Sequence, residues 1–421
     1  MKTHDRLIIS GALLLMGTAL PSLLTAQRAS ADLASLLERG REAFLDYDFD
    51  KALKFYAEYR QKAKRARQPI VEDIDRYEAQ AKTGLRLMEV VQQLVVIDSV
   101  AVPAVDFFKH VRIPASAGFL MPAEEIPFKD GAEYASMAFT PESQSLMLWA
   151  QPDSLGNFRI VESARLVDGS YAEPVYTPDF LGAGGDADFP TLSPDGVTLW
   201  YSSDGDGSMG GYDIFETVRD AATGEYMPPS NVGMPFNSPY DDFLLVTDEQ
   251  NGVGWWATDR NSLEDMVTLY VYMLPEMRRN VDPESDDLMS LARLSEYKLT
   301  WEADTLDNSA QYTQLASEIR AIRPGARPKP AEFHFQVSGG KVYTRYDQLP
   351  DPRSRTAMKN YQKGLADFDK ERAALDALRR QYAAGRTSSL SERILEREKS
   401  VDAARHALRK LRNEVLTSLS R

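Results

Sequence analysis

One stretch of the sequence constrains the fold more than any other: residues 188–215, which read DFPTLSPDGVTLWYSSDGDGSMGGYDIF. Pro194 presets φ and Gly196 takes the positive φ of a tight turn, so the chain reverses there. After the turn, three apolar side chains recur with the period of a strand that has two unlike faces: Val197, Leu199 and Tyr201. A glycine-rich corner at 204–211 leads into a second strand at 212–215. We therefore expect a compact unit of short strands joined by tight turns.

Two similar units flank this one. A good copy lies at 243–260, behind a link at 231–243 that reads NVGMPFNSPYDDF. A weaker copy lies at 134–149, where the turn reads Thr-Pro-Glu-Ser and the glycine-rich corner is missing. The turn prolines Pro141 and Pro194 are 53 residues apart. Each repeat is longer than its strands and turns require, which predicts long connecting loops.

The repeated unit resembles the PD40 (WD40-like) β-propeller repeat, in which such a unit forms the inner part of one blade. The resemblance implies a central small or partial propeller at 98–275 within a multidomain α+β protein. A closed propeller needs at least about four blades. Because three are visible, either the strand-like segments 95–102 and 333–346 complete the ring, or the ring is partial.

The chain opens with a predicted signal peptide, residues 1–26. A basic start at Lys2 and Arg6 precedes a broken apolar run, and Ala26 is a small residue suited to cleavage. The alternative, a transmembrane anchor, requires a longer and unbroken apolar run. Cysteine is absent, which excludes disulfides and the lipid-modified cysteine of a lipoprotein. The expected location is the periplasm or the periplasmic face of the outer membrane, with no membrane span after signal removal.

Helical patterns occupy residues 27–97, and Pro69 opens a third helix that we expect to extend to about Val96. Three residues stand at the spacing of a tetratricopeptide (TPR) unit, which this region resembles: Gly40, Ala52 and Tyr56. The early Trp and the closing Pro of that repeat are missing. Two interpretations stay open, a small packing or docking module and a peptide-binding groove.

The C-terminal part is predicted to contain a polar helical linker at 276–330, a β-hairpin at 331–350 and a basic helical hairpin or coiled coil at 351–421. Two apolar series repeat with heptad spacing: Tyr361, Phe368, Leu375, Leu378 and Tyr382, then Ile394, Val401, Ala404, Leu408, Leu411 and Val415. Each seam is short, so we expect the two helices to pair antiparallel with each other. A homodimer through these helices is the alternative.

Charge is distributed unevenly along the chain. The formal net charge of −14 argues against nucleic-acid binding. Residues 351–421, however, hold 17 Lys/Arg and 10 Asp/Glu, so this tail is +7 and the rest of the chain is −21. A basic helical tail on an acidic body predicts docking to an acidic surface, in the same chain or on a partner.

No catalytic residue, cofactor or metal site is predicted. The four histidines are scattered, and neither a zinc motif nor the Gly-x-Ser-x-Gly turn of serine hydrolases occurs. The Asp204–Gly207 corner lacks the pattern and closing Glu of a calcium loop. Carboxylate pairs are available for glycosidase chemistry, as at Asp186/Asp188 and Asp241/Asp242. The PD40 resemblance instead implies that they make turn and interblade hydrogen bonds.

The sequence therefore predicts an exported, non-catalytic interaction protein that docks other envelope proteins. Similar PD40 and TPR combinations occur in envelope proteins of Bacteroidetes, including components tied to type IX secretion. The predicted partner contacts are Asp204, Asp206, Tyr212, Asp213, Tyr240, Asp241, Asp242, Arg405, Arg409 and Arg412.

The alternative is a periplasmic propeller that binds a glycan or a peptide, and a glycoside hydrolase is the third choice. Ligand binding requires aromatic and acidic side chains clustered on one loop face. The aromatic candidates are Trp200, Tyr212, Trp255 and Trp256. Trp255 and Trp256 are adjacent in a predicted strand, so they must point to opposite faces.

Overall fold

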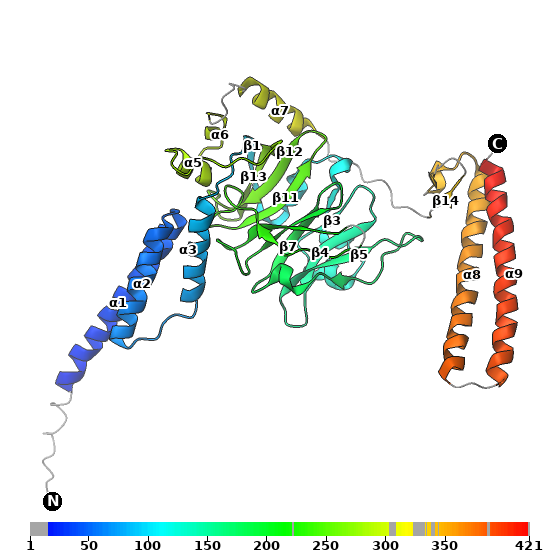
Figure 1. Cartoon of the computed structure of the whole chain (residues 1–421), viewed down its shortest axis with the longest axis horizontal. Helices are drawn as coiled ribbons and strands as arrows, with labels where there is room; N and C mark the ends of the chain where they lie inside the picture. Colours follow the sequence, from blue (N-terminus) through cyan, green and yellow to red (C-terminus); the bar gives the residue numbers. More distant parts are fainter. Residues whose placement is uncertain are drawn as a thin grey trace, which may run out of the picture. The chain divides into compact units, whose positions relative to one another are not determined.

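The computed structural model is a mixed α+β chain with several antiparallel sheets, as predicted (Figure 1). The structure describes residues 16–220, 223–302, 309–322, 333, 335–337, 342–343, 345–384 and 388–419. Two compact units are present. The first comprises residues 1–164 and 173–326, and the second comprises residues 165–172 and 327–421.

The first unit begins with three helices that pack in sequence order. They are α1 (Met16–Leu45), α2 (Phe49–Ala66) and α3 (Ile74–Met88). The Asp48 carboxylate caps α2 by accepting the backbone N–H of Lys51 at 3.2 Å. Gly40 lies against the Tyr56 ring, where a Cβ would collide, so α1 and α2 approach closely. The expected extension of the third helix to Val96 is wrong, because α3 ends at Met88.

Three antiparallel sheets follow, each built from strands that are mostly consecutive in sequence. The first sheet contains β2 (Phe119–Met121), β3 (Ala138–Thr140), β4 (Leu146–Pro152), β5 (Phe158–Ala164) and β6 (Val175–Tyr176). The second contains β7 (Ala187–Leu192), β8 (Thr198–Ser203), β9 (Asp213–Val218) and β10 (Ser230–Asn231). The third contains β11 (Asp242–Asp248), β12 (Val253–Thr258), β13 (Met266–Met273) and β1 (Val96–Pro103).

The repeated sequence units coincide with strand pairs in these sheets. In the second sheet the turn between β7 and β8 is held by the Ser193 hydroxyl, which donates to Asp195 at 2.5 Å. Gly196 adopts a φ of +75° there. Leu199 and Tyr201 of β8 are buried in the core shared by the sheets. The predicted turn and alternation are therefore confirmed for this unit.

The strand β1 precedes the first two sheets in sequence but belongs to the third. It pairs antiparallel with β13, placing Val96 opposite Tyr272 and Pro103 opposite Met266. The expectation that segment 95–102 joins the sheets is thus confirmed. The second segment expected to join them, 333–346, forms a separate two-stranded sheet, so that part of the hypothesis is wrong.

The first residues of β1, on its free edge, are covered by the segment that follows β13. This segment contains α5 (Leu288–Arg293), α6 (Leu299–Glu302) and α7 (Ser309–Ala321). The Val96 N–H donates to Thr300 Oγ1 at 3.0 Å, and Trp301 Nε1 donates to the Val96 carbonyl at 2.7 Å. An uncovered strand edge is a template for aggregation. The helical segment therefore protects the start of this edge, around Val96.

Shorter helical segments fill the connections around the sheets. They are η1 (Ala104–His110), η2 (Ala115–Ala117), η3 (Ala123–Glu125), α4 (Lys129–Tyr134) and η4 (Asp179–Gly182). Phe107 of η1 packs against Phe189 of β7 and Phe243 of β11, with ring centroids 5.5 and 5.8 Å apart. Trp255 and Trp256 lie in two different apolar clusters, which confirms that they point to opposite faces of β12.

The second unit is a small sheet packed on a helical hairpin. Its elements are β14 (Phe335–Gln336), β15 (Val342–Tyr343), η5 (Tyr346–Gln348), α8 (Pro352–Ala384) and α9 (Ser388–Leu419). Ion pairs between α8 and α9 join Glu371 to Arg397 at 2.7 Å and Arg379 to Glu398 at 2.8 Å. Gly364, earlier in α8, lies against Leu408 and Leu411, which come later in α9 than Arg397, so the two helices run antiparallel to each other.

Candidate interaction surfaces

Two aspartates that come directly before a strand in the sequence form hydrogen bonds between neighbouring sheets. Asp186, just before β7, accepts the Phe158 N–H of the first sheet at 2.8 Å, and its own N–H donates to Asp204 at 2.7 Å. Asp241, just before β11, likewise accepts the Tyr212 N–H at 2.8 Å. The Asp241 N–H donates to Asp259 at 2.9 Å.

The two arrangements are equivalent, since each pair of aspartates is separated by 18 residues. In both, one aspartate carboxylate accepts a backbone N–H from the preceding sheet. The carboxylate of a second aspartate accepts the backbone N–H of the first aspartate. This confirms the expectation that acidic residues at these positions serve contacts between the repeated units.

The glycine-rich corner has a steric explanation. A Cβ on Gly210 would collide with the backbone carbonyl oxygens of Ser238 and Tyr240, and one on Gly211 would collide with the Asp241 carboxylate. The corner of the second sheet therefore lies directly against the link that enters the third. Only glycine permits this approach.

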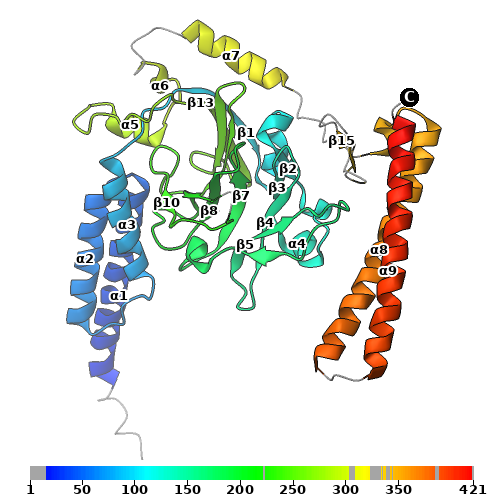
Figure 2. The ribbon, with the colours of Figure 1, turned by 45° about the vertical axis from the view of Figure 1, so that its right-hand side comes forward.

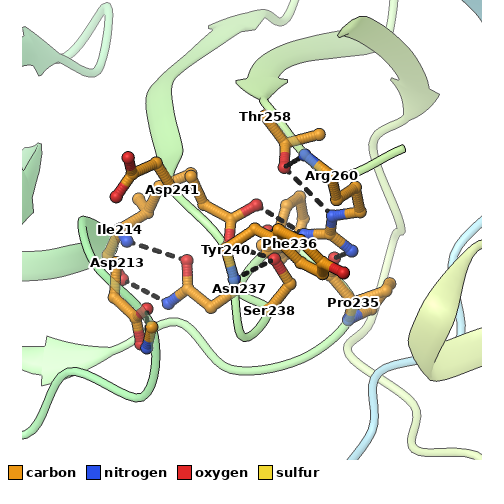
Figure 3. Close-up of polar contacts among 12 residues, drawn as sticks. Asp213, Ile214, Pro235, Phe236, Asn237, Ser238, Tyr240, Asp241, Thr258 and Arg260 are labelled. Atoms are coloured by element: carbon orange, nitrogen blue, oxygen red, sulfur yellow. Dashed lines mark hydrogen bonds and ion pairs between the residues drawn. The ribbon is translucent and has the colours of Figure 1, made fainter. Parts of the chain in front are cut away.

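A buried ion pair lies at the same junction (Figure 3). The Arg260 guanidinium donates to Asp242 Oδ1 at 2.6 Å and to the carbonyl oxygens of Pro235 and Phe236 at 2.8 and 2.5 Å. Ser238 donates to the other oxygen of Asp242 at 2.7 Å. Arg260 and Asp242 are 1% and 0% exposed. Burial opposes the charge of Arg260, but the Asp242 carboxylate raises the pKa of the guanidinium, so Arg260 remains charged.

Asp213 is the second buried carboxylate of the junction. It accepts the backbone N–H groups of Met209 and Gly210 at 2.8 and 3.0 Å, and the Asn231 amide at 2.6 Å. Burial, and then the charge of Asp242, raise the pKa of Asp213 to about 7. The prediction that Asp213 and Asp242 contact a partner is wrong, because both are fully enclosed.

The other predicted residues of the first unit lie nearer the surface. Asp204, Tyr212, Tyr240 and Asp241 are half-buried, and Asp206 is exposed. The Tyr212 ring lies 6.2 Å from Phe243. Burial and then four surrounding carboxylates raise the pKa of the Tyr212 hydroxyl: Asp188, Asp186, Asp204 and Asp241. An aromatic and acidic cluster therefore exists at Tyr212, whereas Trp255 and Trp256 are buried and unavailable to a ligand.

The three N-terminal helices share an apolar core with this junction, and Figure 2 shows them beside the sheets. Met209 and Met234 of the sheet region are buried in the same cluster as Phe44 and Tyr56 of the helices. Tyr47, between α1 and α2, lies close enough to Arg260 for the two to interact: burial raises the pKa of Tyr47 to about 12, and the Arg260 charge opposes that rise. The helices and the sheets are therefore packed together.

A groove opens where the helices meet the glycine-rich corner. We call it the junction groove. Its volume is about 500 Å³, and its walls come from α1, α3 and the backbone at Gly210, Gly211 and Pro239. The Gln80 side chain of α3 donates to the Gly210 carbonyl and so connects the two walls. This composite site was missed in the sequence, because its two walls are about 130 residues apart.

The predicted arginines of the second unit lie on exposed positions of α9. Arg405 pairs with Asp402 at 2.9 Å, and the Arg412 guanidinium lies 5.7 Å from the Phe335 ring centroid. One half of the hairpin lies next to β14 and β15 and consists of residues 352–366 and 403–419. This half contains eight Lys/Arg and one acidic residue. We call this half the basic end. The remaining hairpin residues, 367–402, contain eight Lys/Arg and eight Asp/Glu.

Comparisons of the chain with protein-family models, with curated proteins and with solved structures found no match. Across the described ranges, no group of three or more His, Cys, Asp or Glu side chains is arranged to hold a metal ion. None of the helices in the described part of the chain has the length and apolar character that a membrane span requires. Functional interpretation therefore depends on the geometry of the two surfaces.

Proposed function

We propose that this chain is an exported, non-catalytic interaction protein of the bacterial cell envelope. The observation that carries the proposal is the basic end. All eight of its Lys and Arg side chains are exposed, while the chain outside residues 351–421 is acidic. An exposed concentration of like charge in a compact unit favours association with a partner of opposite charge. The partner would be an acidic envelope protein.

The architecture we propose is a partial propeller of PD40 type joined to TPR-like helices. Two observations support it: three meander-like sheets follow one another in sequence, and the same carboxylate contact recurs at two sheet boundaries. The broken apolar leader and the absence of cysteine support export to the periplasm without lipidation. A link to type IX secretion is part of the same proposal and rests on the PD40 and TPR resemblance.

The test places a photo-crosslinking amino acid, p-benzoylphenylalanine, at position 409 or 412 in cells. Matched control positions are 372 and 380, which are exposed arginines in the balanced half of the same hairpin. We expect one or a few envelope proteins to be cross-linked from 409 and 412 and not from the controls. Equal products from both sets would overturn the proposal, and products that contain only a second copy would replace it with homodimerisation.

A second candidate function is ligand binding at the cluster around Tyr212. It is favoured by the coincidence of half-buried Tyr212, Phe189 and Phe243 with half-buried carboxylates. Aromatic faces with adjacent acceptors suit glycans or cationic peptide side chains. Retention on polysaccharide resins that is lost in Tyr212→Ala would support this candidate. Wild-type protein that flows through every such resin would exclude glycan binding.

A further inference from the structure

The junction groove has an apolar floor that carries one hydroxyl group. Phe44, Tyr56 and Tyr77 supply the floor, and the rings of Tyr56 and Tyr77 are 5.9 Å apart. Tyr56 is 2% exposed, and its hydroxyl makes no hydrogen bond within the described part of the chain. The hydroxyl oxygen is not one of the fully enclosed polar atoms that lack a partner, so it reaches the open space of the groove. The Tyr56 hydroxyl is therefore available as a hydrogen-bond donor to a molecule in the groove.

A cation lies next to this hydroxyl. Arg41 lines the groove, and its charge lowers the pKa of Tyr56, although burial and then Tyr77 raise that pKa to about 12. Among the residues that the structure describes, Arg41 has no ion-pair partner. The second arginine of the groove, Arg76, differs because it pairs with Asp73 at 3.5 Å. Arg41 and Tyr56 thus form a pair of neighbouring donors that face the same space.

The remaining charge in the groove does not neutralise Arg41. Glu38 lies three residues before Arg41 on α1 and also lines the groove, but the two side chains form no ion pair. Asp73 is already occupied by Arg76. A ligand carboxylate that accepts from Arg41 and from the Tyr56 hydroxyl would satisfy both donors at once. A neutral ligand would make no charge-assisted hydrogen bond with Arg41.

We propose that the junction groove binds a short peptide of a partner protein that carries a carboxylate beside an apolar side chain. The carboxylate accepts from Arg41 and Tyr56, and the apolar side chain packs against Phe44 and Tyr77. The volume of about 500 Å³ lies within the range that holds small ligands. The proposal deepens the interaction function, on which it rests, by naming the chemistry of one partner segment.

The composite walls make the groove specific to the assembled first unit. The Gly210 and Gly211 backbone closes one side, and the helices alone would leave that side open. Because Gln80 holds the Gly210 carbonyl, the distance between the walls is fixed before a peptide arrives. Preorganisation of this kind reduces the entropy lost on binding.

The test uses the full chain and two immobilised hexapeptide libraries. In the first, a fixed Leu or Phe neighbours a fixed Asp or Glu, and the other positions are random. The second library replaces the acid by Asn or Gln, and both have amidated C-termini. We expect about tenfold greater retention on the acidic library, which is the range for a charge-assisted hydrogen bond. Equal retention on the two libraries would overturn the proposal.

Three variants locate the binding. Tyr56→Phe removes only the hydroxyl, and Arg41→Gln removes only the charge, so each should abolish the preference for the acidic library. Arg39→Gln is the matched control, because Arg39 is on the same helix but lies over the Phe55 ring outside the groove. A preference that persists in both groove variants would also overturn the proposal.

The outcome is separable from that of the proposed docking function. A double variant, Arg405→Gln and Arg409→Gln, with the photo-crosslinking residue kept at position 412, changes the basic end and leaves the groove intact. It should keep the acidic-library preference and lose the cross-linked partner. If cross-links are lost and the library preference is unchanged, only the contact at the basic end has been removed. If the library preference is lost and the cross-links remain, only binding in the groove has been removed.

Discussion

The sheets of the first unit and the helical hairpin of the second use charged side chains in opposite ways. In the sheets, Asp213, Asp242 and Arg260 are enclosed and each is held by several hydrogen bonds. In the hairpin, charged side chains lie on the surface, and the excess of positive charge is gathered at one end. Charge density in a sequence therefore does not by itself locate a binding surface. The buried charges of the sheets hold neighbouring backbone segments in place, and the exposed charges of the hairpin are available to a partner.

The largest expected effect comes from breaking the buried pair. Arg260→Met leaves the Asp242 carboxylate buried without its cation, which should lower the free energy of unfolding by about 3–5 kcal/mol. Urea unfolding followed by tryptophan fluorescence measures this, because all five tryptophans lie in the first unit. Lys62→Met is the control, because it removes an exposed pair with Glu58 on α2 of the same unit, and it should cost less than about 1 kcal/mol. A loss below about 1 kcal/mol in Arg260→Met would contradict a structural role for the pair.

The next effect is a dependence of stability on pH. Burial raises the pKa of Asp188 to about 6 in the folded state, from about 3.9 when unfolded. The folded state therefore holds this proton more tightly. The resulting stabilisation is fully present below about pH 4 and is lost as the pH rises through about 6. Through Asp188 alone, the free energy of unfolding should fall by about 2–3 kcal/mol from pH 4 to pH 7.

Asp188→Asn should remove this part of the pH dependence, as measured by urea unfolding at successive pH values. The control is Asp195→Asn, since hydrogen bonds from Ser193 and Val197 lower the pKa of Asp195. Asp195 is ionised in both states above about pH 5, so the slope between about pH 5 and 7 should not change. An unaltered slope in Asp188→Asn would show that the carboxyl of Asp188 is not the titrating group.

The smallest effect concerns the ion pair between the two hairpin helices. A double-mutant cycle with Arg397→Gln and Glu371→Gln should give a coupling energy of about 0.2–1 kcal/mol, because the pair is partly exposed. The coupling should shrink in about 1 M salt, where charges are screened beyond about 3 Å. Thermal unfolding followed by circular dichroism measures it. A coupling above about 2 kcal/mol would mean that this seam is as enclosed as the sheet junction.

Local patterns predicted the parts of the fold that local chemistry determines. Pro194 and Gly196 placed the turn between β7 and β8, and the heptad series placed α8 and α9. The end of α3 was mispredicted because distant hydrogen bonds compete for its continuation. The Gln92 N–H donates to the Met234 carbonyl, and the Val281 N–H donates to the Val91 carbonyl, each at 2.8 Å. These hydrogen-bond partners are distant in the sequence, so a pattern of neighbouring residues does not reveal them.

The candidate site was predicted only in part, because it also depends on contacts between segments that are distant in the sequence. The aspartates and glycines of the corner stood out in the sequence, but which of them are enclosed depends on the approach of the 231–243 link. Arg260 ends the third repeat and carries no local sign that it is buried. Arg41 and Tyr56 looked like ordinary helical residues, and their proximity to Gly211 arises only when the helices pack on the sheets.

The pairing of β1 with β13 has a consequence for how the chain is made. Val96 meets Tyr272, so about 170 residues must be synthesised after β1 before its partner strand exists. At about 5–20 residues per second this delay lasts roughly 10–35 s. Throughout that time an apolar strand with an open edge lacks its native neighbour. The nascent chain is exposed to aggregation through this strand during that time, and its last sheet forms only when synthesis has passed residue 273.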